Sequence, residues 1–228
     1  MTDRPLTASA LVAVVRRDLE AVEARLFAHP YVAAAEAGRL SRRDLFVFAG
    51  QQRHIILSDL RSVALLVHRY GGTPSGPFFA AGLATETSAL THLAAFGRAV
   101  GAMDLAELAA VEPLPGALAY THFVAWLALY GSDAEFAAAF LANLPAWGRN
   151  CGRLSRALQE RYALGTDAVA FFDRFAGDAP GFEAGALEVI QGGLDRGVPA
   201  TEIRRAAQLL QSYELMYWDA LHAAAGGG

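Results

Sequence analysis

The stretch that decides the fold is residues 201–222, TEIRRAAQLLQSYELMYWDALH, near the carboxyl end of the chain. Its apolar residues recur at the three- and four-residue spacing of an amphipathic helix, namely Ile203, Ala206, Ala207, Leu210, Tyr217, Trp218 and Leu221. Glu214 interrupts this apolar stripe. A carboxylate on the buried face of a helix is costly unless it is paired, hydrogen-bonded or protonated. We therefore interpret Glu214 as the first candidate for acid–base chemistry, the alternative being a satisfied core carboxyl with no catalytic role.

The rest of the chain also predicts helices, because alanine, leucine and phenylalanine dominate and β-branched residues never alternate over the length of a strand. Ser41 is a plausible cap for a helix that ends near Gly71, and Asp133 for the long segment 134–162, which contains Pro145. The remaining helices are expected at about 11–29, 78–100, 104–111, 116–130, 167–175, 182–196 and 201–222, with a connector around Gly38. The sequence predicts a single all-α domain over residues 1–228, with 1–8 and 223–228 frayed.

Gln52 is a second polar residue on an apolar helical face. It shares its stripe with Leu45, Phe48, Ile56 and other apolar side chains of the helix that follows Ser41. Two polar groups that face one interior, Gln52 and Glu214, indicate a pocket rather than a fully apolar core.

The bulk composition excludes several classes of partner. The formal net charge is −4, and no basic cluster is present, which argues against nucleic acid and anionic membranes as partners. No apolar run reaches the roughly 18 residues that a membrane span needs. A single cysteine, Cys151, cannot form an internal disulfide and fits a reducing compartment. We expect a cytoplasmic protein.

Several short motifs, in their order along the chain, resemble the TenA/THI-4 (thiaminase II) family. They are His29-Pro30-Tyr31, Gly38-Arg39-Leu40-Ser41, Gln51-Gln52, Ala119-Tyr120-Thr121, Leu144-Pro145 and the segment YELMYWD at 213–219. The resemblance covers the chain from His29 to Asp219. It implies a heme-oxygenase-like helical bundle of the TenA/PqqC type, without a cofactor, that forms dimers or tetramers. The high hydrophobic fraction, 54%, also favours a homo-oligomer.

The resemblance implies a pocket for an aminopyrimidine or a similar small heteroaromatic ligand. Members with thiaminase II activity release hydroxymethylpyrimidine for thiamine salvage, and their proton-handling glutamate corresponds to Glu214. The tyrosine that lines the family's pocket corresponds to Tyr120. Tyr213 and Tyr217 are expected to supply further stacking faces and hydroxyl groups, and Gln52 is expected to orient the ring.

Two departures from the family pattern bear on activity. Ala146 stands where the family has its nucleophilic cysteine, so the resemblance implies that it lines the ligand pocket, and Gln52 stands where an aspartate holds the amino side of the pyrimidine. Cys151 is five positions beyond Ala146, about 140° around an ideal helix, so it does not replace the lost thiol. The nearest implied activity is that of family members which hydrolyse aminopyrimidines without this cysteine, through acid–base groups.

Two other readings stay open. A protein that kept the pocket but lost the reaction would act as a binding or regulatory protein, and an oxidase could use the same cavity, with or without iron. We expect no metal site, because Glu86 and His92 lie about 120° apart on one helix and no Glu-x-x-His pair occurs. Nothing singles out a heme ligand either, and His29 before Pro30 is better interpreted as a residue at a helix end.

Overall fold

The computed structural model describes residues 6–177 and 180–226, and these residues form helices with no β-strand among them. The all-α prediction is therefore confirmed. The elements are α1 (Ala8–Phe27), α2 (Pro30–Glu36), α3 (Arg42–Tyr70), α4 (Gly76–Val100), the 3-10 turn η1 (Glu107–Ala110), α5 (Pro115–Tyr130), α6 (Asp133–Tyr162), α7 (Thr166–Ala176), α8 (Pro180–Asp195) and α9 (Ala200–Ala225).

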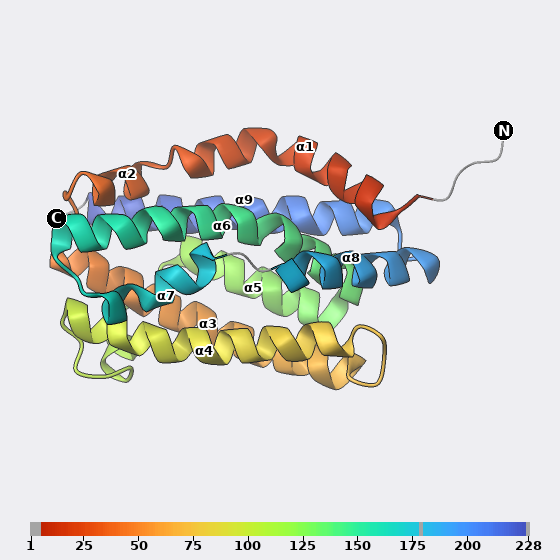
Figure 1. Ribbon diagram of the computed structural model, residues 1–228, viewed down its shortest axis with the longest axis horizontal. Helices are drawn as coiled ribbons and strands as arrows, with labels where there is room; N and C mark the ends of the chain where they lie inside the picture. Colours follow the sequence, from red (N-terminus) through yellow and green to blue (C-terminus); the bar gives the residue numbers. More distant parts are fainter. Residues whose placement is uncertain (1–5, 178–179, 227–228) are drawn as a thin grey trace.

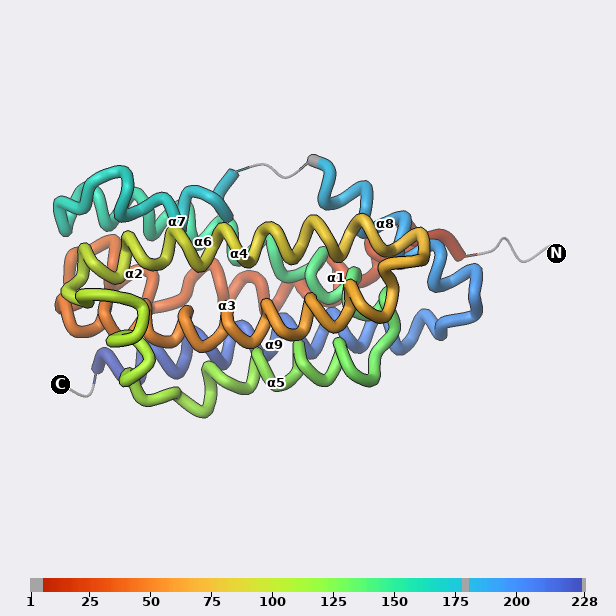
Figure 2. Tube along the Cα trace, turned by 90° about the horizontal axis from the view of Figure 1, so that it is seen from below, coloured from red at the N-terminus to blue at the C-terminus, as the bar shows by residue number. Residues whose placement is uncertain are grey.

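The long helices run roughly along the long axis of the molecule (Figure 1). α1 and α4 lie on opposite sides of the bundle, and α9, α6 and α5 lie between them. α7 and α8 follow one another along one edge (Figure 2). α9 packs against α6, α5 and α1, and it also contacts α2 and α3. The helix that the sequence singles out is therefore central to the bundle.

α9 is central because its apolar stripe is long enough to face several neighbours at once. Trp218 and Tyr217 are among the largest fully buried side chains of the described residues. The helix continues to Ala225, and Ala8 already begins α1. The expected fraying of 1–8 and 223–228 falls in part on residues 1–5 and 227–228, which lie outside the described residues.

The start of α3 follows the predicted cap. The Ser41 side chain accepts a hydrogen bond from the backbone N–H of Asp44, and the Asp44 carboxylate accepts one in return from the backbone N–H of Ser41. This reciprocal pair satisfies two backbone donors that a helix start otherwise leaves free.

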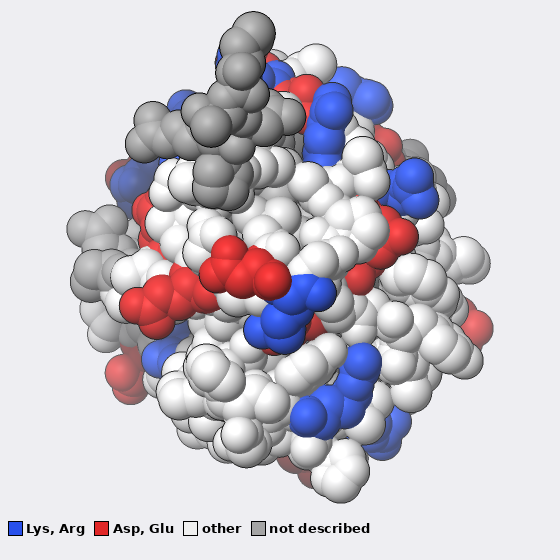
Figure 3. Space-filling model, turned by 90° about the vertical axis from the view of Figure 1, so that its right-hand side faces the viewer, with Lys and Arg blue, Asp and Glu red and all other residues white. Residues whose placement is uncertain are grey.

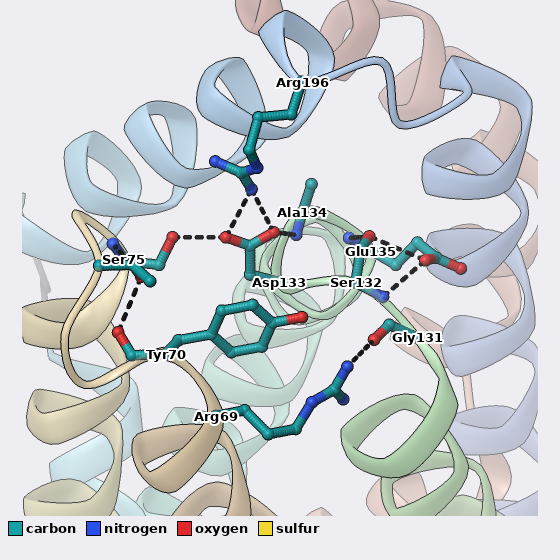
Figure 4. A network of polar contacts seen from close by, with 10 residues as sticks. Arg69, Tyr70, Ser75, Gly131, Ser132, Asp133, Ala134, Glu135 and Arg196 are labelled. Carbon is teal, nitrogen blue, oxygen red and sulfur yellow. Dashed lines mark hydrogen bonds and ion pairs between the residues drawn. The ribbon is translucent and has the colours of Figure 1, made fainter.

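The expected cap of α6 is wrong by one residue. Ser132, not Asp133, caps the helix, and it forms a capping box with Glu135. The Asp133 carboxylate is instead held by groups from other helices. It accepts two hydrogen bonds from Arg196, at 2.6 and 2.7 Å, and one from the Ser75 hydroxyl (Figure 4).

This polar network ties three chain reversals together at one end of the bundle. Ser75 precedes α4, Asp133 opens α6 and Arg196 follows α8. Arg69 of α3 adds hydrogen bonds to the carbonyl oxygens of Gly131 (Figure 4) and of Ala128, where α5 ends. The buried Asp133 carboxylate thus has charged and neutral donors, which offset its desolvation.

The connector expected around Gly38 contains a short helix that the sequence did not predict. α2 begins directly after His29, whose Nδ1 accepts a hydrogen bond from the backbone N–H of Tyr31. Pro30 occupies the first helical turn, where its missing N–H costs nothing. His29 is therefore the N-cap of α2, whereas the sequence predicts it at the end of the first helix, which ends at Phe27 instead. The expected helix 104–111 is reduced to the four-residue turn η1.

The surface carries both signs of charge. Figure 3 shows the right-hand end of the molecule in Figure 1, where basic and acidic side chains lie interspersed among uncharged residues. Within the described residues, no helix is long and apolar enough to cross a membrane.

α8 approaches α6 closely at Gly193. A methyl group added at Gly193 would overlap the Cβ atom of Ala134 in α6. Ala134 is a rigid, fully buried neighbour, so the two helices would have to separate. The Gly192-Gly193 pair is therefore a close packing point rather than a ligand cradle.

Gly193→Ala is expected to destabilise the protein by about 1–3 kcal/mol, the usual cost of overpacking a core. Thermal unfolding measures this loss as a lower Tm. Gly181→Ala is the matched control in the same helix, because nothing lies within 4 Å of a methyl group at that position. Equal Tm values for the two variants would contradict the close approach of α8 and α6.

Candidate functional site

Six helices enclose a small cavity in the middle of the bundle. Its volume is about 50 Å³, enough for a few water molecules. α3, α6 and α9 supply most of its wall, and α4, α5 and α7 complete it. The lining residues are Gln52, Ile55, Ile56, Asp59, Glu86, Tyr120, Phe140, Asn143, Leu144, Trp147, Phe175, Glu214 and Tyr217.

Gln52 and Glu214 reach this cavity from different helices. Their exposed fractions are 4% and 2%, so neither group is in bulk solvent. Gln52 lies on α3 and Glu214 on α9, and both belong to the lining. The structure therefore brings together the two polar residues that the sequence singles out on apolar stripes.

The Glu214 carboxylate is held by two donors. The indole N–H of Trp218, one turn along α9, donates to Oε1 at 3.1 Å, and the Asn143 amide of α6 donates to Oε2. Burial raises the pKa of Glu214 from its ordinary value to about 8, although the Trp218 and Asn143 hydrogen bonds favour the charged form. A carboxyl group with a pKa close to neutral can both give and take a proton at physiological pH.

Two tyrosine hydroxyls extend this polar network. Gln52 donates from Nε2 to the hydroxyl oxygen of Tyr217 at 2.7 Å. Tyr120 donates to Oδ1 of Asn143 at 3.3 Å, on the other side of the amide that binds Glu214. Burial raises the pKa of both tyrosines well above the ordinary value, so both keep their protons.

Two of the predicted ligand residues lie away from the cavity lining. Tyr213 is next to Glu214 in sequence but faces α5, where its ring packs 5.2 Å from that of Phe123. Neighbouring helix residues differ by about 100° in direction, which separates Tyr213 from Glu214. Ala146 is fully buried in the apolar core of α6.

Cys151 does not compensate for the alanine at position 146. Its thiol is fully buried in the apolar core and lies outside the cavity lining. Burial raises the pKa of this thiol well above the ordinary value, and nearby Glu214 adds to the shift. The reactive form of cysteine is the thiolate, so this environment suppresses nucleophilic chemistry.

Sequence reasoning missed three polar residues of the cavity as parts of a pocket. Asn143 interrupts a run of alanine, phenylalanine and leucine in α6, a signal as strong as that of Gln52. Asp59 lies two turns beyond Gln52 on the same face of α3. The sequence suggests Glu86 only as a metal ligand. In the structure its helix, α4, supplies the part of the cavity wall that carries Glu86.

Glu86 and His92 are the pair that the sequence offers as metal ligands. In residues 6–177 and 180–226, no group of three or more His, Cys, Asp or Glu side chains is arranged to hold a metal ion. The other histidine considered, His29, donates from Nε2 to Asp219 at 3.1 Å, because its Nδ1 accepts from the Tyr31 backbone.

The chain is similar to known proteins over nearly its whole length. A model of the TENA/THI-4/PQQC family matches residues 16–223. A search of curated protein sequences finds no match.

Several solved structures share the fold. A TenA homologue from Pseudomonas syringae pv. tomato has a TM-score of 0.80 at 15% identity, over 97% of this chain and 98% of that one. A TenA family transcription regulator from a Silicibacter species has a TM-score of 0.70 at 19% identity, over 99% of each chain. A Shewanella denitrificans domain of unknown function, described as having a heme oxygenase-like fold, has a TM-score of 0.73 at 11% identity, over 93% and 92%. The predicted heme-oxygenase-like fold is thus confirmed.

The raised pKa of Glu214 gives stability a pH dependence. The folded protein holds the Glu214 proton more tightly than the unfolded chain does. The resulting stabilisation of the folded state is complete below about pH 4.5 and is lost as the pH rises through 8. The Glu214→Gln variant has no ionisable group at this position, so its stability does not fall with pH for this reason. The Tm of the variant minus that of the wild type should rise by at least about 2 °C between pH 5 and pH 8.5.

Glu160→Gln is the control for this measurement, because Glu160 is exposed on α6. Its Tm difference from the wild type should not change over the same pH range. A flat difference for Glu214→Gln as well would mean that Glu214 has an ordinary pKa.

Proposed function

The chain belongs to the TENA/THI-4/PQQC family, and we propose that it hydrolyses an aminopyrimidine or a similar small heteroaromatic ligand in thiamine salvage, without a nucleophilic cysteine. The observation that carries the proposal is Glu214. It is a buried carboxyl group on the cavity wall, it is held by Trp218 and Asn143, and its pKa lies near 8.

Glu214 can supply both proton transfers of such a hydrolysis. As the carbon–nitrogen bond to an exocyclic amine breaks, the protonated carboxyl group gives its proton to the departing nitrogen. A water oxygen then forms the new bond to carbon, and the Glu214 carboxylate takes the proton that this water loses. The carboxyl group ends as it began, so no cysteine and no redox partner is needed.

Gln52 and the tyrosines would orient the ring. The Gln52 amide nitrogen is engaged by the Tyr217 hydroxyl, which fixes the amide and leaves its carbonyl oxygen to accept from an amino group of the ligand. Tyr120 and Tyr217 add aromatic faces to the cavity wall. The family has an aspartate at the position of Gln52. Because the Gln52 amide is neutral, we expect the protein to discriminate less strongly between amino and hydroxyl substituents on the ligand ring.

The ligand must enlarge the cavity as it binds. Drug-sized ligands occupy pockets of roughly 300–1,000 Å³, whereas the cavity measures about 50 Å³. Trp147 and Phe175 are among the lining residues that remain partly exposed, so an outward movement of these aromatic side chains is one way to enlarge the cavity.

A second candidate function is ligand binding without turnover. Ala146 and the buried Cys151 leave the cavity wall without a thiol nucleophile, which favours a protein that recognises a heteroaromatic ligand and reports its presence. The Silicibacter relative is described as a transcription regulator. Ligand-dependent thermal stabilisation without product would support this function.

Glu214→Gln should lower the hydrolysis of an aminopyrimidine that carries an aminomethyl group by about 10²–10⁴-fold, the usual contribution of general acid–base catalysis. The measurement is ammonia release together with chromatography of the hydroxymethyl product. Binding of the substrate should change little, because Gln keeps the size of the side chain.

Cys151→Ala is the matched control and should retain turnover within about threefold, since its thiol lies outside the cavity lining. If Cys151→Ala loses activity and Glu214→Gln keeps it, hydrolysis depends on the thiol and the assignment to Glu214 is wrong.

We further propose that the chain forms a homo-oligomer, a dimer or a tetramer, through α5 and α9. A groove of about 730 Å³ between these helices is lined by Phe123, Trp126, Tyr130 and Leu209, among others. The exposed fractions of Trp126 and Tyr130 are 48% and 74%, which are high for aromatic side chains. Contiguous exposed apolar surface of this kind marks association sites.

Trp126→Glu should shift the wild-type dimer or tetramer toward the monomer, because a carboxylate at this position would be desolvated in the interface. Light scattering after gel filtration measures the mass. Met103→Glu is the control, since Met103 is 82% exposed and lies outside the groove. A wild-type protein that remains a monomer at high concentration would contradict the proposal.

A further inference from the structure

The cavity contains a carboxyl oxygen that has no hydrogen-bond partner among the described residues. Asp59 of α3 lines the cavity wall, and only 3% of the residue is exposed. Its Oδ1 is buried and has no hydrogen-bond partner within the described part of the chain. Leaving a buried acceptor unpaired costs free energy, and native proteins rarely tolerate it without a reason.

A second carboxyl group lies beside it. Glu86 enters the same cavity from α4. Burial raises the pKa of Asp59 well above its ordinary value, and nearby Glu86 raises it further. Burial also raises the pKa of Glu86, to about 7. A negative charge on either carboxyl group therefore disfavours ionisation of the other, and a cation placed beside the pair would favour their charged forms.

Within the described part of the chain, no ion pair with a basic side chain balances a negative charge on Asp59 or Glu86. Ile55 and Ile56, on the same helix as Asp59, contribute apolar side chains to the cavity wall, and none of the lining residues is basic. Arg174 of α7 lowers the pKa of Glu86 through space, but its side chain is exposed, and among the described residues no ion pair joins it to either carboxyl group. The pair also offers too few ligands for a metal ion.

We propose that Asp59 and Glu86 form a subsite for a cationic amino or amidinium-type group of the ligand. The inference rests on the proposed function only in taking the cavity as the ligand site. Asp59 lies about 10 Å along α3 from Gln52, farther than one small ring extends. The ligand therefore carries its basic group at the end remote from Gln52, and the donors of that group satisfy the unpaired Oδ1.

The charge and geometry of the pair favour a cation over a neutral group. Carboxylate oxygens accept hydrogen bonds but donate none, and an amidinium presents two parallel N–H donors to such an acceptor. In an apolar wall the attraction between opposite charges is screened less than at the surface. A neutral amide of the same shape gains only part of this interaction.

Acetamidinium and acetamide provide the test, because they have the same shape but differ in charge, and they suit a cavity of this size. Dissociation constants come from NMR titration of isotope-labelled protein. The wild type should bind acetamidinium at least tenfold more tightly than acetamide. Asp59→Asn and Glu86→Gln should each reduce this preference below about threefold, while the exposed Glu160→Gln should keep it.

Two outcomes would overturn the subsite: equal binding of the two probes to the wild type, or an undiminished preference in both cavity variants. Thermal unfolding verifies that each variant is folded, and Glu86→Gln serves if Asp59→Asn does not fold. Turnover of the aminopyrimidine is measured separately. A charge preference without turnover would reject the proposed hydrolysis and retain the subsite, whereas turnover without a charge preference would do the reverse.

Discussion

The structure depends on one buried carboxyl group and the donors that hold it. Glu214 is central in α9, and α9 contacts α1, α2, α3, α5 and α6. Without partners, a carboxylate at this position would oppose folding by several kcal/mol. Trp218 supplies one donor from the same helix, and Asn143 supplies the other from α6. The position of α6 against α9 is thus fixed by a polar contact as well as by apolar packing.

The contacts of Asn143 spread this constraint through the bundle. Its amide nitrogen also donates to Gln211 of α9 at 3.2 Å, and its carbonyl oxygen accepts from Tyr120 of α5. One amide therefore connects three helices around the cavity. α6 contains Pro145 just beyond this residue, and proline removes a backbone hydrogen bond from a helix. The polar contacts of Asn143 lie where the backbone of α6 has fewer internal bonds.

The chemistry of the cavity depends on the polar groups of its wall, because Ala146 stands where the family has a reactive cysteine. Ala146 and Cys151 both lie in the apolar core, so the reactive groups on the wall are carboxyl, amide and phenol groups. Burial raises the pKa of the three carboxyl groups Asp59, Glu86 and Glu214. These groups differ in their partners: Glu214 has two hydrogen-bond donors, whereas Oδ1 of Asp59 has none. Different surroundings suit chemically similar groups to different tasks, which we propose to be proton transfer for Glu214 and the binding of a positive charge for Asp59.

Local signals in the sequence determined most of the helices and two residues of the cavity, and the family resemblance added Tyr120 and Tyr217. Apolar spacing, the Ser41 cap and the glycine after Tyr70 are local signals, and local signals set where a helix begins, ends and hides its apolar face. They therefore identified Glu214 and Gln52, each a polar residue on such a face. Only the tertiary structure decided which helix faces meet. It brings Asn143, Asp59 and Glu86 into the same cavity and packs Tyr213 against Phe123. It also places Arg196 beside Asp133, which binds this arginine and does not cap α6. The physical reason is that the rotation and axial position of one helix against another depend on side-chain packing between segments far apart in the chain.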